Sequence, residues 1–166
     1  SSFTNWNFVQ EMFPGYTIIN RGFGGSRLPD IKMYLEQVKY PPNIKQLVIY
    51  AGDNDIAAGA NAETVLERFQ EVFELVRKNC PKLPVAYMSI KGCPGRIRSI
   101  QVVKEANELI KEYLSRQKNA AFVDIYHPTM VAEDKPMEDI YVEDGVHMNR
   151  KGYEVWASVL KPYLKK

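Results

Sequence analysis

Apolar positions recur along the chain with two different periods. Spacing of three to four residues predicts a short helix over residues 5–13 and longer helices over 29–38, 61–79, 99–117 and 150–164. Short runs rich in β-branched and aromatic residues predict strands over 16–20, 46–51, 85–90 and 121–125. Residues 126–143 follow neither period and predict a long irregular segment, a kind of segment that often carries function.

The alternation of these strands with helices of ten or more residues predicts the α/β fold class. The run Gln46–Ala51 is almost continuously apolar, as in a strand buried on both faces of a parallel sheet. We therefore expect a parallel sheet with helices on both faces. Because the chain has 166 residues and shows no repeat or linker, residues 1–166 are predicted to form a single domain.

Composition narrows the classes of function. With 45% hydrophobic and 25% charged residues, the chain has the composition of a soluble globular protein. A net charge of +2 gives no reason to expect binding to nucleic acid, and no apolar run is long enough to span a membrane. Cys80 and Cys93 lack metal-ligand spacing and are expected to be unpaired thiols. The sequence begins abruptly without a signal peptide, so the compartment stays open, as does the oligomeric state.

Polar residues that could carry chemistry lie where predicted strands end. Residues 21–26, 52–55 and 91–96 each follow a strand, and Asp144-Gly145-Val146-His147 precedes the last helix. In open parallel sheets, ligands bind at the carboxyl ends of the strands. The convergence of these segments on one edge predicts an active site there.

His147 is one of two histidines, and Asp144 stands three positions before it. A carboxylate at this spacing can hold Nδ1–H of the imidazole and leave Nε2 free to act as a base. The alternative interpretation is a loop that only leads into the last helix, which Asn149 is expected to cap. The motif alone does not separate a base from a capping loop.

Two other segments could supply an oxyanion site. The loop Arg21–Ser26 fits neither a dinucleotide-binding nor a Walker phosphate motif, so it is either a tight turn or a place where a backbone N–H approaches an oxyanion. Asn54 is a natural fixed amide donor for such an oxyanion, although asparagine also favours turns. The carboxylates at 53 and 55 have no further ligand in register, so we expect no metal site.

In combination, Asn20-Arg21-Gly22-Phe23-Gly24-Gly25, Gly52-Asp53-Asn54-Asp55 and Asp144-Gly145-Val146-His147 resemble the sequence blocks of the SGNH (GDSL-type) hydrolase superfamily. The resemblance covers essentially the whole chain. It implies a three-layer α/β/α, flavodoxin-like fold and an esterase or acylhydrolase that works through a serine acyl-enzyme without a cofactor. By the same resemblance, His147 is the general base, Asp144 its partner, and Gly25 and Asn54 are oxyanion donors.

The family's first block, a strand followed by Gly-Asp-Ser or a variant, has no full counterpart, because the sequence begins Ser1-Ser2-Phe3-Thr4-Asn5-Trp6. Many members carry an aromatic residue five positions after the nucleophile, and Trp6 then indicates Ser1. Its backbone N–H is expected to be a third oxyanion donor. The alternatives are Ser2 as nucleophile and a tag remnant. Since the first strand of a flavodoxin-like sheet is central, we expect that residues precede Ser1 in the protein.

Several interpretations stay open. Lys91 and Arg96 could contact the polar end of a substrate, or could be solvated loop charges, and His127 is expected at the surface or in packing. The predicted substrate is a small-molecule ester with a short acyl chain, such as an acetylated carbohydrate. The rival functions are a non-catalytic carbohydrate- or ligand-binding module and, less favoured, a phosphate- or nucleotide-binding protein that uses the loop 22–26.

Overall fold

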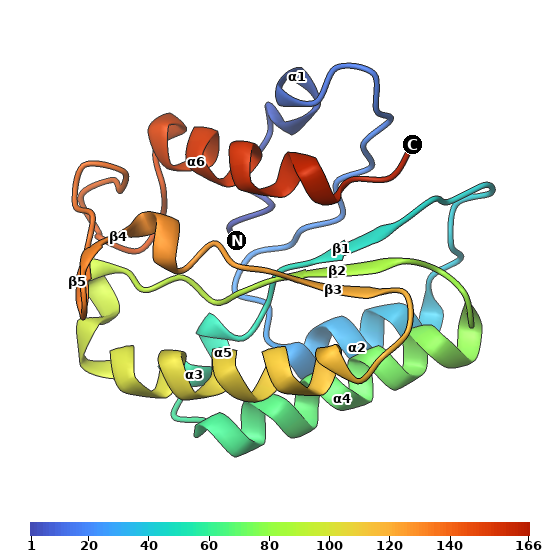
Figure 1. The fold of residues 1–166 in the computed structure, drawn as a ribbon, viewed down its shortest axis with the longest axis horizontal. Helices are drawn as coiled ribbons and strands as arrows, with labels where there is room; N and C mark the ends of the chain where they lie inside the picture. The colour runs from blue at the N-terminus through green and yellow to red at the C-terminus, as the bar shows by residue number, and fades with distance from the viewer.

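A central parallel sheet separates two layers of helices in the computed structural model, which describes residues 1–166 (Figure 1). The sheet has the order β1 (Leu47–Ile49), β2 (Val85–Met88) and β3 (Ala120–Val123), all parallel. One face is covered by α2 (Leu28–Gln37), α4 (Ala62–Asn79) and α5 (Ile100–Ser115), and the other by α1 (Val9–Met12) and α6 (Arg150–Leu160). This arrangement confirms the predicted three-layer α/β/α fold.

Successive residues of β2 point to opposite faces of the sheet and enter two separate cores. Val85 and Tyr87 belong to a cluster of 22 buried residues under α2, α4 and α5. Ala86 and Met88 belong to a cluster of 13 buried residues on the face covered by α6. All four side chains are buried, which explains why the strand reads as a continuous apolar run.

Asparagine side chains cap the first turns of α4 and α6. The backbone N–H of Thr64 donates to Asn61 Oδ1 at 2.9 Å at the start of α4. The backbone N–H of Gly152 donates to Asn149 Oδ1 at 3.2 Å at the start of α6, as predicted for Asn149. Asn54, for which a turn was the alternative interpretation, lies instead in the first turn of a short helix, α3 (Asp53–Ala57).

Gly52 makes the sharp connection from β1 into α3. Its φ of +127° lies in the region that favours glycine. A β-carbon there would lie 2.7 Å from Ile90 Cδ1, so a larger residue would be strained and would displace the Ile90 side chain. The glycine therefore fixes where Asp53 and Asn54 leave the sheet.

The predicted strand over residues 16–20 is wrong: this segment joins no sheet. The Gln10 amide instead donates to the carbonyl oxygen of Tyr16 at 2.7 Å and accepts from the backbone N–H of Ile18 at 2.9 Å. Asn20 Nδ2 donates to the carbonyl oxygen of Phe3 at 2.6 Å. A β-branched run favours extended backbone, but only a neighbouring strand makes it part of a sheet.

β1 lies at the edge of the sheet, with β2 on one side only. A largely apolar cavity of about 610 Å³ lies beside it, bounded by Ser1, Ser2 and residues 15–23 as well as by β1. The expectation that residues before Ser1 supply a further, central strand stays a prediction.

The remaining elements lie near the ends of these strands. The segment read as irregular contains a small hairpin of β4 (Met130–Ala132) and β5 (Lys135–Pro136). Short 3₁₀ helices are η1 (Pro94–Ser99), η2 (His127–Thr129) and η3 (Lys161–Tyr163). Cys80 and Cys93 are unpaired. None of the helices combines the length and apolar character that crossing a membrane requires.

Candidate active site

Ser1, His147 and Asp144 form a hydrogen-bonded chain. His147 Nε2 lies 3.1 Å from Ser1 Oγ, and His147 Nδ1 lies 2.5 Å from Asp144 Oδ2. The residues are 146 positions apart at their extremes, so the contact is made by the fold rather than by local sequence. With an ionised Asp144 accepting from Nδ1–H, Nε2 is the nitrogen that can accept the Ser1 proton.

The Asp144 loop holds the carboxylate in place before it meets the imidazole. The backbone N–H groups of Val146 and His147 donate to Asp144 Oδ1 at 2.8 and 2.9 Å. Gly145 has a φ of +66°, and its carbonyl oxygen accepts from the backbone N–H of Gly95 at 2.9 Å. The bond from His147, followed by those two N–H groups, keeps the pKa of Asp144 well below its usual range. The carboxylate is therefore ionised at neutral pH.

A second Asp-x-x-His pair has the same local geometry and no serine. Asp124 Oδ1 accepts from the backbone N–H groups of Tyr126 and His127, and His127 Nδ1 lies 2.6 Å from Asp124 Oδ2. The His127 side chain is 73% exposed, as expected for a surface histidine. Spacing alone does not separate the two pairs, because Asp124 stands three residues before His127 just as Asp144 stands three residues before His147. The motif is thus a local fold that becomes chemically useful only beside a nucleophile.

The serine that faces His147 is Ser1, because Ser2 is turned into the protein. The Ser1 nitrogen donates to the carbonyl oxygen of Phe23 at 3.2 Å, and its carbonyl oxygen accepts from the backbone N–H of Asn5 at 2.9 Å. Ser2 is 5% exposed, its Oγ accepts from Lys91 Nζ, and its carbonyl oxygen accepts from the Tyr153 hydroxyl at 2.7 Å. We call Ser1–Ser2 the serine turn.

Trp6, which pointed to Ser1 in the sequence, anchors the first residues of the chain. Its side chain is 1% exposed and stacks on Tyr153 of α6, with ring centroids 5.1 Å apart. Tyr153 is also the residue that holds Ser2. The same aromatic cluster therefore fixes the serine turn against the helix that follows His147.

Asn54 and Gly25 lie on segments that are tied to one another. Asn54 Nδ2 donates to the carbonyl oxygen of Ser26 at 3.0 Å, and its Oδ1 accepts from Arg96 Nη1 at 3.1 Å. Because a guanidinium can only donate, this contact fixes which end of the amide is the NH₂ group. The loop is bonded to Ser1 at Phe23 and to Asn54 at Ser26, so Gly25 lies between two anchored points.

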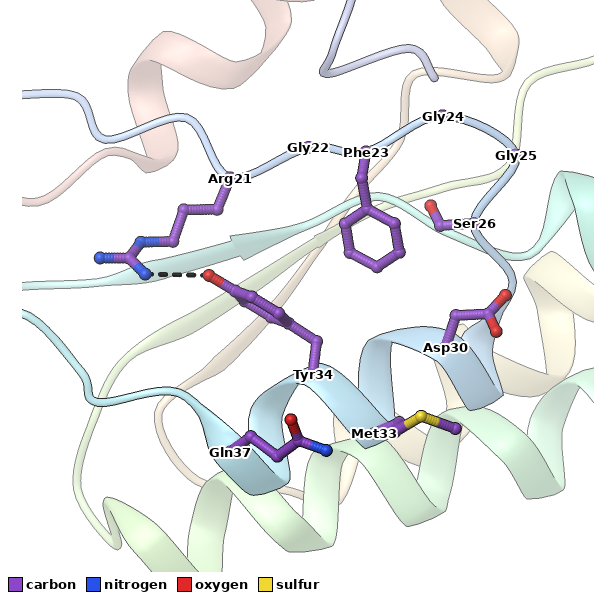
Figure 2. A pocket seen from close by; sticks show the side chains of 10 residues that line it. All are labelled: Arg21, Gly22, Phe23, Gly24, Gly25, Ser26, Asp30, Met33, Tyr34 and Gln37. Carbon is purple, nitrogen blue, oxygen red and sulfur yellow. Dashed lines mark hydrogen bonds between the residues drawn. The ribbon is translucent and has the colours of Figure 1, made fainter.

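Gly25 adopts a φ of +65°, in the left-handed region that favours glycine. Its backbone N–H donates to no protein acceptor, and no atom lies within 4 Å of where its β-carbon would be. An open groove of about 730 Å³ borders this loop, between residues 21–26 and α2 (Figure 2). A free N–H at the wall of an open groove can bind a substrate oxygen.

Lys91 is buried in the protein, although the sequence suggested either a contact with the substrate or a solvated loop charge. It is 2% exposed, so it is not a solvated loop charge. Its ammonium lies 2.8 Å from Asp53 Oδ2 and also contacts Ser2 Oγ and the Tyr50 hydroxyl. Lys91 and Arg96 lower the pKa of Asp53 even though burial alone would raise it. Arg96 is half-buried, 3.8 Å from Asp53 Oδ1, and bonded to Asn54.

No group of three or more His, Cys, Asp or Glu side chains is arranged to hold a metal ion.

The profile of the GDSL-like Lipase/Acylhydrolase family matches residues 1–155. The match spans most of the chain, and the chain therefore belongs to this family. It is a hydrolase that acts on ester bonds, as the resemblance implied.

Solved structures share the fold at low sequence identity. A protein from Streptococcus pneumoniae, provisionally named a platelet activating factor, is 22% identical with a TM-score of 0.86, over 99% of this chain and 80% of that chain. A provisionally assigned acylhydrolase from Bacteroides fragilis is 22% identical with a TM-score of 0.82, over 98% and 81%. A carbohydrate esterase family 3 protein from Talaromyces cellulolyticus is 18% identical with a TM-score of 0.69, over 91% and 75%. A comparison with curated protein sequences gave no match.

Proposed function

We propose that this hydrolase is a serine esterase that forms its acyl-enzyme on Ser1. The observation that carries the proposal is the 3.1 Å contact between Ser1 Oγ and His147 Nε2. Ser1 Oγ attacks the ester carbonyl carbon while its proton passes to Nε2. The protonated imidazole then gives that proton to the departing alkoxide, which leaves as the alcohol. Water, activated by the same nitrogen, cleaves the acyl-enzyme and releases the acid.

In this mechanism Asp144 selects the tautomer of His147 and stabilises the imidazolium that forms after proton transfer. Gly25 N–H, Asn54 Nδ2 and the backbone N–H of Ser1 bind the oxyanion. Support for Gly25 is its free N–H, and support for Asn54 is the fixed direction of its amide. The Ser1 nitrogen donates to the carbonyl oxygen of Phe23 in the resting structure. To bind the oxyanion, it must share its hydrogen bonding between the two oxygens or exchange Phe23 for the oxyanion.

We further propose a short acyl chain on a carbohydrate as the substrate. The groove beside Gly25 combines aromatic surfaces with polar groups, a lining suited to a sugar: Arg21, Phe23, Asp30, Tyr34 and Gln37 (Figure 2). The similar fungal structure is a carbohydrate esterase, which is consistent with this choice.

A second substrate class is favoured by the apolar cavity of about 610 Å³ that Ser1 also lines. That cavity has the character of a site for a long acyl chain. A p-nitrophenyl ester series from acetate to palmitate separates the two classes. We expect kcat/KM to be highest for acetate and to fall beyond butyrate. A maximum at octanoate or longer would contradict the short-chain proposal and assign the acyl group to the cavity.

The mechanism itself is tested by p-nitrophenyl acetate hydrolysis with Ser1→Ala and His147→Ala. Each variant is expected to lose about 10,000-fold or more in kcat, because the two groups act as a unit. The wild-type turnover serves as the reference. Absence of hydrolysis by the wild type across a broad ester panel would favour the non-catalytic binding module instead.

A further inference from the structure

A buried ion pair lies directly beneath the serine turn. Lys91 and Asp53, which we call the buried ion pair, are 2% and 9% exposed, and their charged atoms are 2.8 Å apart. Lys91 follows β2 and Asp53 begins α3, so the pair joins the ends of two neighbouring strands. Ser2 and Tyr50 contact the Lys91 ammonium, and Arg96 lies beside the Asp53 carboxylate.

The ammonium of Lys91 has no capacity left for a substrate. It has three N–H bonds and three acceptors, Asp53 Oδ2 at 2.8 Å, Ser2 Oγ at 3.2 Å and the Tyr50 hydroxyl at 3.3 Å. The Tyr50 hydroxyl in turn donates to Asp53 Oδ2 at 3.0 Å. The network is closed, and a direct role of Lys91 in substrate binding has no geometric basis.

Stability alone does not account for such a pair. The cost of removing two charges from water offsets most of their attraction, and apolar replacements of a buried pair are often neutral or stabilising. A buried pair does, however, define directions and distances, because each unmade bond would be costly. The buried ion pair can therefore hold the groups bonded to it at a fixed separation.

Lys91 contacts the serine turn, and Asp53 lies next to the proposed oxyanion donor Asn54. Lys91 holds the Oγ of Ser2, the residue bonded to Ser1. Asp53 precedes Asn54, and Arg96 spans both, 3.8 Å from the Asp53 carboxylate and 3.1 Å from Asn54 Oδ1. One network of charges thus connects the serine turn to the amide proposed as an oxyanion donor.

We propose that Lys91 and Asp53 are positioning residues that hold the Ser1 hydroxyl and the Asn54 amide at the separation the reaction needs. The inference rests on the proposed function, in which Ser1 is the nucleophile. Displacement of a reacting group by about 1 Å can cost about 100-fold in rate. The pair is expected to act on kcat and to leave KM almost unchanged, because neither residue touches the substrate.

The test compares Lys91→Met, Asp53→Asn and the double variant in the full chain. Each single variant leaves one charge buried without its partner and is expected to lower Tm by roughly 10 °C. The double variant removes both charges, and its Tm is expected within about 4 °C of wild type. Its kcat for p-nitrophenyl acetate should still be about 100-fold lower, with KM within about threefold. Lys104→Met is the matched control, since Lys104 pairs with Asp134 outside the site, and it should match wild type in both measurements.

A double variant with wild-type Tm and wild-type kcat would show that the pair has a structural role only and would overturn the inference. If the double variant does not fold, Ser2→Ala decides, because it removes the contact to Lys91 and keeps the pair. We expect Ser2→Ala to retain its Tm within a few degrees and to lose about tenfold in kcat; unchanged kcat would equally overturn the inference. Failure of the proposed function gives a different result, since Ser1→Ala would then hydrolyse the ester as fast as wild type.

Discussion

Replacing Asn54 by alanine tests the oxyanion site without touching the hydrogen-bonded chain of Ser1, His147 and Asp144. The amide makes two contacts in the resting structure, one to the carbonyl oxygen of Ser26 and one from Arg96. The substitution removes the proposed oxyanion donor and leaves those two partners to be resolvated. The substitution therefore changes both the stability of the protein and its kcat.

The expected loss of folding stability is small. Loss of the bond to Ser26 is worth about 1 kcal/mol, and Arg96 keeps Asp53 as a neighbour. For a chain of this size that corresponds to a decrease in Tm of about 2–4 °C. The kinetic term is larger, because a donor aimed at the developing charge contributes about 2.7–4 kcal/mol, or about 100- to 1000-fold in kcat. We expect KM to change by less than about threefold.

The matched control is Asn61→Ala, which removes an asparagine of the same size and also costs stability. Asn61 caps α4 through a 2.9 Å bond from the backbone N–H of Thr64 and makes no hydrogen bond to the proposed site residues. Loss of this cap is expected to cost about 1 kcal/mol. The two variants should therefore share a similar Tm and differ by two orders of magnitude or more in kcat, measured by p-nitrophenyl acetate hydrolysis and differential scanning calorimetry. An Asn54→Ala enzyme with kcat within about threefold of the Asn61→Ala enzyme would refute the oxyanion assignment.

Two further predictions follow from the carboxylates. Asp144→Asn is expected to lower kcat by about 10,000-fold, because the amide favours the wrong imidazole tautomer, whereas Asp124→Asn in the second Asp-x-x-His pair should leave ester hydrolysis unchanged. Because the pKa of Asp53 is lowered on folding, its ionised form contributes stability that is complete above about pH 4 and is lost as the pH falls through the lowered value. Urea unfolding should show that the free energy of unfolding decreases less between pH 6 and pH 2.5 in the Lys91→Met/Asp53→Asn variant than in wild type. Equal decreases in the two proteins would contradict this account.

The helices and most strands were predictable because their signals are local. Apolar periodicity predicted α4 and α6, and Asn149 marked the first turn of α6. The segment over 16–20 was misread because β-propensity describes one strand, whereas a sheet needs two. Its backbone groups are bonded to Gln10 instead, a partner that no local pattern indicates.

The loops of the site were predictable from the sequence, but the local pattern alone did not separate the two Asp-x-x-His pairs. Asp144 and Asp124 each stand three residues before a histidine and fold identically around it. Only the long-range contact with Ser1 distinguishes them, and that contact depends on how α6 and the serine turn pack. The burial of Lys91 was equally invisible, because a lysine in a glycine-rich loop reads as a solvent-exposed charge until the fold encloses it.

The central claim, that Ser1 is the nucleophile activated by His147, is tested most directly by a fluorophosphonate probe followed by peptide mass spectrometry. The account predicts one covalent adduct, located on Ser1, that forms in wild type and in Ser2→Ala. Ser1→Ala should give no adduct, and His147→Ala should slow its formation by orders of magnitude. An adduct on Ser2, or labelling of Ser1 at an unchanged rate in His147→Ala, would contradict it.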